Sequence, residues 1–351
     1  MGKAYRKEFS PLIYNTPTVV NISLYLLAVN QINELEMRFT PKFRVHLRWH
    51  DFRLKYMNLN EGKYNTVERS HQSDIWIPTL FFPENDDNVV IRNDDHSMLE
   101  ILALGKGHRN DINDLHEAML YEGTENLLIF TREMDVSLRC SYDLRNYPFD
   151  SQTCPIKLEV PFALRDYVKL VPGKAKNIWK KSLAQFDIIN VAFATNDSTP
   201  YIIECNIKLQ RIPLNHLATT YAPTLCILSM AIITLFIDES HFEATIMVSL
   251  TAMLVMYTLF QSISTNMPST AYLKLLDFWL IFGLVMPFII FVVEVSWELG
   301  VGESRGVHCS EGKSMKRKRN LGFKQLTKYG IPAFTLGFIL AYIFVVLSIH
   351  D

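Results

Sequence analysis

The segment from residue 243 to residue 265 combines the length of a membrane helix with polar side chains at helical spacing. Steps of three and four along it select Glu243, Met247, Thr251, Leu254, Thr258, Gln261 and Thr265. On a helix these positions share one face, so hydroxyl, amide and carboxylate groups line up on one side of an otherwise apolar segment. A few threonines alone would indicate hydrogen bonds to neighbouring helices. Because the stripe runs the whole span, it favours a water-filled pore formed by several copies of the chain.

The chain of 351 residues has a charged first half, and its second half contains four apolar segments. Each of the four reaches or approaches the ~20 residues that cross a bilayer as a helix. We therefore expect an extracellular domain, three membrane helices, a cytoplasmic link and a fourth helix with an extracellular tail. The expected boundaries are 1–212, 213–297, 298–329 and 330–351.

Lysine and arginine cluster between the third and fourth apolar segments, around residues 313–328. Such clustering marks a cytoplasmic loop and places both the N-terminal half and the C-terminus outside the cell. The sequence thus predicts a multi-pass protein of the plasma membrane. No signal peptide precedes Lys3, although an extracellular domain normally needs one, so we expect a mature or trimmed chain.

The first half reads as an antiparallel β-sandwich. Residues 42–49 alternate strictly between apolar and basic side chains, which is the period of a half-buried strand. Several short strands separated by turn residues are typical of a sandwich. Further strands are expected at 88–92, 126–140, 152–160, 186–195 and 201–211.

Composition excludes several classes of function. The net charge of −1 gives no reason to expect nucleic acid as a partner. In the aspartate-rich stretch 83–116, no glycine occupies the turn position that a calcium-binding loop would need after residues 110–114, so we expect no metal there. We find no nucleotide-binding loop or nucleophilic triad, and we expect neither a cofactor nor enzymatic activity.

The five cysteines divide between compartments. Cys140 and Cys154 lie in the extracellular half, where oxidising conditions favour a disulfide between them. The other three are expected to be free thiols. Two triplets, at Asn21 and Asn196, match the glycosylation pattern.

The segment from Cys140 to Cys154, with Tyr147-Pro148-Phe149-Asp150 at its centre, resembles the signature loop of the Cys-loop receptor family, the pentameric ligand-gated ion channels. Other motifs are similar to that family along nearly the whole chain. They are Trp49-His-Asp51-Phe-Arg53-Leu54, Trp76-Ile-Pro78 with Thr79 where aspartate is usual, and Arg211 followed by Pro223.

The resemblance implies a ring of five subunits with the second helix lining the pore. Leu254 would then form a hydrophobic gate, with Met247 as a constriction below it. A ring of Glu243 carboxylates would favour cations. Anion-selective relatives usually carry a Pro-Ala pair where this chain has Phe242, Glu243 and Ala244. The alternatives are that Glu243 only caps the helix N-terminus and that Leu254 is ordinary helix packing.

The resemblance places agonist binding between subunits, where this sequence departs from the amine receptors. Pro83 and Pro161 stand where aromatic residues are usual, so a cation–π box is poorly supported. The basic strand face around Arg44, His46 and Arg48 suits an anionic group or is simply solvated. The ligand-binding candidates are Arg44, His46, Phe81, Phe82, Phe162, Phe193 and Tyr201.

Coupling between ligand and pore is expected where the loop core meets the connection between the second and third helices. Glu34 and Arg211 are expected nearby, as an ion pair. The coupling candidates are Glu34, Tyr147, Pro148, Phe149, Arg211, Pro268 and Tyr272.

The sequence therefore predicts a cation-selective, ligand-gated ion channel subunit of an invertebrate type. Its partners would be identical or related subunits, a small-molecule agonist, permeant inorganic ions and membrane lipids. The alternatives are a non-conducting auxiliary or receptor-like subunit and an anion-selective channel.

Overall fold

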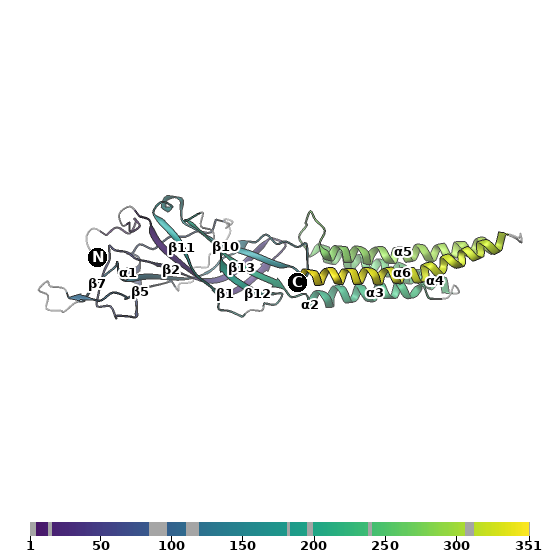
Figure 1. Cartoon of the computed structure of the whole chain (residues 1–351), viewed down its shortest axis with the longest axis horizontal. Coiled ribbons are helices and arrows are strands. Elements are labelled where there is room, and N and C mark those ends of the chain that lie inside the picture. Colours follow the sequence, from purple (N-terminus) through teal and green to yellow (C-terminus); the bar gives the residue numbers. More distant parts are fainter. Residues whose placement is uncertain are drawn as a thin grey trace. The chain divides into compact units, whose positions relative to one another are not determined.

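A computed structural model describes residues 5–12, 16–83, 97–109, 119–180, 183–194, 199–237, 241–305 and 312–350, without the side chains of 300–321 and 350. The chain forms two compact units (Figure 1). The first comprises Met1–Tyr142 and Ser151–Gln210, and the second comprises Asp143–Asp150 and Arg211–Asp351. The tip of the disulfide loop is thus grouped with the helices.

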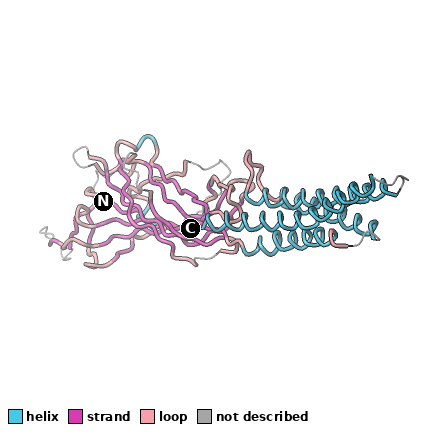
Figure 2. Tube along the Cα trace, turned by 45° about the vertical axis from the view of Figure 1, so that its right-hand side comes forward, coloured by secondary structure: helices cyan, strands magenta, loops and turns pink. Residues whose placement is uncertain are grey.

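The first unit is built from three β-sheets, whose strands are magenta in Figure 2. The largest sheet has the strand order β11-β1-β2-β8-β5-β4, and β9 also pairs with β2. Its strands are β1 (Thr18–Asn33), β2 (Arg38–Trp49), β4 (Tyr64–Thr66), β5 (Met98–Leu102), β8 (Leu127–Asp135), β9 (Leu138–Arg139) and β11 (Val168–Asn177). The second has the order β10-β13-β12, with β10 (Ser151–Glu159), β12 (Phe186–Phe193) and β13 (Ile202–Arg211). The third, β3-β7-β6, joins β3 (Lys55–Met57), β7 (Met119–Glu122) and β6 (His108–Arg109). Two short helical turns, α1 (Arg69–Gln72) and η1 (Phe162–Leu164), complete the unit.

Alternating side chains explain which strand faces are buried. In β2, Phe43, Val45 and Leu47 are at most 4% exposed, while the basic residues between them are half-buried on the other face. The same period of two runs through β10 and β13, where Ile156 and Ile207 are fully buried. The apolar sides of both larger sheets therefore form the core of this unit.

Most strand expectations are confirmed, with two differences. The segment 126–140 forms two strands, β8 and β9, because Val136 interrupts the ladder, and its N–H donates to the carbonyl of Pro41. The pair β1–β11 is parallel, whereas the sequence predicted an antiparallel sandwich throughout. The expected strand at 88–92 lies outside the described residues, as does most of the aspartate-rich stretch.

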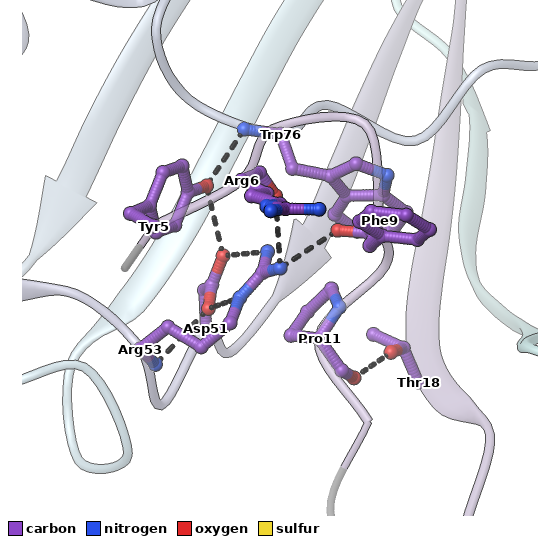
Figure 3. A network of polar contacts seen from close by, with 8 residues as sticks. All are labelled: Tyr5, Arg6, Phe9, Pro11, Thr18, Asp51, Arg53 and Trp76. Atoms are coloured by element: carbon purple, nitrogen blue, oxygen red, sulfur yellow. Dashed lines mark hydrogen bonds and ion pairs between the residues drawn. The ribbon is translucent and has the colours of Figure 1, made fainter. Parts of the chain in front are cut away.

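The N-terminal segment is fixed to the end of β2 by one buried carboxylate (Figure 3). Asp51, fully buried, binds Arg53 through two bonds of 2.7 and 2.8 Å and accepts the phenol of Tyr5 at 3.1 Å. Arg53 also donates to the carbonyl of Phe9 at 2.7 Å, and the N–H of Trp76 donates to Tyr5 at 2.9 Å. The Trp-x-Asp-x-Arg motif therefore stabilises this edge of the unit, and burial raises the pKa of Tyr5 to about 12.

The second unit is helical and contains four candidate membrane spans, at Leu214–Thr234, Phe242–Thr265, Leu275–Leu299 and Gly322–Ile349. The first is continuous through α2 (Leu214–His216), a π-helical turn η2 (Leu217–Tyr221) and α3 (Ala222–Thr234), and the others are α4 (Phe242–Thr265), α5 (Leu275–Arg305) and α6 (Gly312–His350). The four long helices run side by side in both views (Figures 1 and 2). Ala231, Leu235, Met256 and Ile290, each at most 1% exposed, form a core between the first three spans, and Ile331 of α6 packs against it. The chain is therefore a multi-pass membrane protein.

Candidate functional site

The predicted stripe on α4 is exposed along its whole length. All seven of its residues are exposed, and Met247 and Leu254 are each 62% exposed. The opposite face of α4 is buried through Thr245, Ser249, Ala252 and Met256. In a single chain, the stripe therefore lies within the broad surface of α4 that the other helices leave uncovered, which also includes Val248, Leu250 and Val255.

The buried face of α4 is held by packing and by one polar contact. Ala252 and Met256 belong to the apolar core shared with α3 and α5. The hydroxyl of Ser249 donates to Oε2 of Glu294 on α5 at 2.8 Å, and both side chains are buried. Since a buried carboxylate is costly without a partner, this bond fixes the rotation of α4 about its own axis.

The threonines of the stripe donate their hydroxyl hydrogens to their own helix. Thr251 donates to the carbonyl of Met247 at 2.8 Å, and Thr258 and Thr265 bond to preceding carbonyls in the same way. Their oxygen lone pairs are left facing outward. The stripe therefore presents acceptors to whatever lies beside it.

Leu254 lies at an edge of this stripe. It helps to line an apolar hollow of about 470 Å³ between α4 and α5, together with Met253, Tyr257, Leu284, Val285 and Phe288. The hollow is almost purely hydrocarbon, so it offers no polar group to a hydrophilic ligand.

The tip of the disulfide loop is bonded to the first residues of α5. The carbonyls of Arg145 and Tyr147 accept the N–H groups of Leu275 and Leu276 at 2.8 and 3.2 Å. The N–H of Leu144 donates to the hydroxyl of Tyr272 at 3.0 Å. These bonds satisfy amides at the start of α5, which have no partner within the helix.

The same loop tip also contacts the start of the first span. The phenol of Tyr147 lies 3.1 Å from Nε2 of His216, and the ring of Phe149 lies 6.2 Å from that of Tyr221. Pro148 and Pro268 are buried. The loop core that the sequence singled out thus contacts two helices of this unit.

Arg211 forms an ion pair with Asp150. Its Nε lies 2.7 Å from Oδ1 of Asp150, both side chains are 2% exposed, and its guanidinium lies 4.5 Å from the ring of Tyr147. Asp150 binds this guanidinium in bidentate geometry, a pairing that the sequence did not predict. The ion pair between Glu34 and Arg211 stays a prediction.

The basic candidates lie together on the outer face of β2. Arg44 is paired with Glu133 of β8, with its Nε 3.0 Å from the carboxylate. His46 lies against the ring of Tyr25 at 5.0 Å, and its Nε2 is buried without a hydrogen bond in the described part of the chain. Burial and the neighbouring Arg48 and Arg44 lower the pKa of His46.

The aromatic candidates do not form one group. Phe162 and Tyr201 both contact the guanidinium of Arg165, at 5.2 and 4.5 Å from its Cζ. Phe81 is 39% exposed and pairs through its backbone with Glu159. Phe82 is instead a core residue, 7% exposed and packed edge-on to Phe43. Phe193 is half-buried at the end of β12.

Sequence reasoning missed Arg165, Glu159, His216 and Glu294. Arg165 pairs with Glu159, and Glu294 lies within the third span, where a carboxylate in an apolar run is a recognisable signal. For Arg165 the signal is weaker, since an arginine after Pro161 and Phe162 reads as a loop residue.

The disulfide between Cys140 and Cys154 is confirmed. Cys205 is buried and Cys226 is exposed, both as free thiols, and Cys309 lies outside the described residues. Asn21 is half-buried inside β1, between β2 and β11, and Asn196 lies outside the described residues. Among the described residues, no group of three or more histidines, cysteines and carboxylates is placed to hold a metal ion.

Comparison with known proteins links the chain to receptor subunits. It is 24% identical over 305 residues to a gamma-aminobutyric acid receptor subunit beta of Lymnaea stagnalis, covering 82% of this chain and 57% of that protein. It is also 24% identical over 276 residues to a gamma-aminobutyric acid receptor subunit rho-3 of Rattus norvegicus, covering 76% and 55%. Over 279 residues it is 24% identical to a glutamate-gated chloride channel subunit beta of Haemonchus contortus, covering 75% and 60%.

The chain thus spans little more than half the length of the curated relatives it matches. Residues 1–213 match the family described as the neurotransmitter-gated ion-channel ligand binding domain, which is more than half of the chain. With the disulfide loop and the four candidate spans, this match establishes that the chain belongs to the Cys-loop family of ligand-gated ion channels, which are not enzymes.

Proposed function

We propose that this chain is a subunit of a plasma-membrane ligand-gated ion channel in which five copies surround a pore lined by α4. The observation that carries the proposal is the uncovered stripe of α4. Seven side chains at helical spacing are exposed, while the opposite face of the helix is buried. A polar stripe in hydrocarbon is costly unless it faces water or polar groups, and a ring of stripes around an axis supplies both.

The gate of this pore is proposed at Leu254. Five leucines at one level form a narrow apolar ring from which water withdraws, and ions do not pass a dry ring. Met247, two turns nearer the start of α4, is the second constriction. Leu254→Ser would keep this level wetted and leave the channel partly open without ligand.

The selectivity that the residues favour is for cations. Glu243 is exposed at the start of α4 and is the sole carboxylate of the stripe. Five such carboxylates at the cytoplasmic mouth would concentrate cations and repel anions.

Anion selectivity is the second candidate, and a specific observation favours it. One of the relatives is a glutamate-gated chloride channel subunit. The competing helix-capping role of Glu243 would be compatible with anion flow, because a carboxylate at a helix N-terminus stabilises that helix whichever ion passes.

Voltage clamp of Leu254→Ser, expressed alone, distinguishes these candidates without knowledge of the agonist. A cation channel gives a reversal potential that moves in the negative direction when external sodium chloride is diluted, and Glu243→Ala added to this variant reduces that shift. An anion channel gives the opposite shift. Absence of current despite surface pentamers would favour a non-conducting, auxiliary or receptor-like subunit.

The ligand is proposed to bind between copies of the first unit. The basic outer face of β2, with Arg44 and His46, and the face around Phe162 and Tyr201 are the two surfaces that carry the candidates. The loop tip 143–150 would couple binding to the pore, since it is bonded to the start of α5 and to the first span.

A further inference from the structure

The face around Phe162 and Tyr201 already contains a cation. The guanidinium of Arg165 lies over both rings, with Cζ 5.2 Å from the centre of Phe162 and 4.5 Å from the centre of Tyr201. At these distances each ring attracts the positive charge. Phe162 is 82% exposed, so the cluster lies at the surface of the unit.

The guanidinium of Arg165 has hydrogen-bond partners for only some of its N–H donors. Its Nη2 donates to Oε1 of Glu159, whose side chain is 8% exposed. Its Nε is buried without a partner in the described part of the chain, and Nη1 makes no hydrogen bond to any described residue. Because the buried Nε is closed to an incoming group, Nη1 supplies the N–H donors that a ligand at the surface can reach.

The backbone holds this cluster in place. The loop 161–167 is closed by bonds from Leu164 to Pro161 at 2.8 Å and from Tyr167 to Leu164 at 3.0 Å. Val160 donates to the carbonyl of Tyr201 at 3.0 Å, and the backbone of Glu159 is paired with that of Phe81. The two rings and the arginine are therefore preorganised, so ligand binding does not need to order this loop.

We propose that Arg165 selects the class of ligand at this face, admitting a carboxylate-bearing ligand and excluding one whose only charge is an ammonium group. This inference rests on the proposed ligand-gated function and names the chemistry of its ligand. An ammonium group placed on these rings would have to displace a guanidinium that is already paired with a buried carboxylate. A carboxylate instead meets the unused N–H donors of Nη1.

Glu159 sets the strength of this site. Its carboxylate competes with the ligand for the same guanidinium, so Glu159→Gln would tighten carboxylate binding while Arg165→Ala weakens it. The two substitutions therefore move affinity in opposite directions, which a general loss of folding would not do.

The test compares gamma-aminobutyric acid with 1-propylamine, the same molecule without its carboxylate, by calorimetric titration of the purified full-length chain. The wild type is expected to bind the acid and not the amine. Arg165→Ala is expected to lose about 10- to 100-fold in affinity for the acid, the range for hydrogen bonds to a charged group. It should also gain affinity for the amine, because Glu159 and the two rings are then left without a cation. Arg165→Lys, which keeps the charge without the fork, should lie between.

Lys55→Ala is the matched control, since it removes a basic residue paired with Glu122 in the same unit. It should bind like the wild type. Equal binding of both probes by the wild type, no binding of the acid at 10 mM (~10,000-fold above a Kd of about 1 μM), or an unchanged affinity of Arg165→Ala would each overturn the inference. Ligand-independent current through Leu254→Ser would persist in all these cases, so failure of this inference is distinguishable from failure of the channel proposal.

Discussion

At the scale of single residues, the outer face of β2 buries more polar atoms than its alternating sequence of apolar and basic residues indicates. The Nε2 of His46 and the Nε of Arg48 are buried without a hydrogen-bond partner among the described residues. Arg44 and Arg48 flank His46 on its own strand, Tyr25 covers it from β1, and β8 contributes Glu133, which binds Arg44. Lys42 on the same face also lies near Glu133, so protonating His46 would add a further positive charge to a half-buried, basic face.

Acid should destabilise the first unit through His46. Its pKa in the folded state lies below the ordinary 6.5, so the unfolded chain takes up the proton first. The contribution to stability is present above about pH 6.5 and is lost as the pH falls through the folded pKa. His46→Gln should flatten the decrease in melting temperature between pH 7 and pH 5, measured on the full chain in detergent.

His71→Gln is the control, because the side chain of His71 is 65% exposed. Its melting curve should follow that of the wild type at each pH. An acid dependence that His46→Gln leaves unchanged would show that other groups cause the loss.

The disulfide can be tested by counting thiols. The chain has five cysteines, and two of them are joined. Alkylation of the denatured, unreduced chain should add three labels by intact mass, whereas five labels would exclude the bridge. Cys140→Ser should lower the free energy of unfolding by about 2–5 kcal/mol, mainly because the unfolded chain gains freedom.

At the scale of elements, the sequence predicted the strands and helices that have a periodic pattern of side chains. It missed the contacts between residues that lie far apart in the chain. The period of two in β2 and the four apolar runs were sufficient to predict its strand and the spans. The first three helices were expected to end by residue 297, and the third span continues to Leu299. Ser249 on another helix donates to Oε2 of Glu294 within this span, a contact that the sequence could not predict.

Contacts between distant residues were also missed at the candidate site. The loop core Tyr147–Asp150 was identified from its motif, but the residues that it contacts could not be identified from the sequence. Asp150 and Arg211 are 61 residues apart, and their pairing depends on how the loop folds against the helices. The cluster of Arg165 with Phe162 and Tyr201 was likewise hidden, because a contact between two loops leaves no periodic signal.

The pair Asp150–Arg211 should be strongly coupled in stability. Both side chains are 2% exposed, so removing one partner leaves a buried charge. Asp150→Ala and Arg211→Met should each lower the free energy of unfolding by about 3–5 kcal/mol, and the double variant should lose clearly less than the sum. The measurement is a double-mutant cycle from urea unfolding of the full chain in detergent.

The exposed pair Lys55–Glu122 offers the matched control, with side chains 64% and 39% exposed. The same cycle there should give a coupling below about 1 kcal/mol. Additive losses at Asp150 and Arg211 would mean that the two charges are stabilised independently, by other contacts in the unit.

At the scale of the whole molecule, the proposed five-fold pore accounts for the exposed stripe of α4. The helices of one chain bury the face with Ser249 and Ala252 and leave Thr251 and Thr258 facing outward. Five chains around an axis would enclose these hydroxyls with water, as the proposed pore demands. A single chain in lipid would leave them against hydrocarbon, where they lower the stability of the span.

Cysteine substitution along α4 should therefore separate the two faces in a channel that is open. In a background of Cys226→Ser and Leu254→Ser, a water-soluble, charged thiol reagent should modify Thr251→Cys and Thr258→Cys and change the current. The same reagent should leave Ser249→Cys and Ala252→Cys unmodified, because both of those positions are buried against neighbouring helices.

Native mass measurement of the purified chain should give five times 40.6 kDa. Equal modification of both faces, or a particle with another number of copies, would contradict the five-fold pore. The stripe would then pack against a different partner instead of lining a pore.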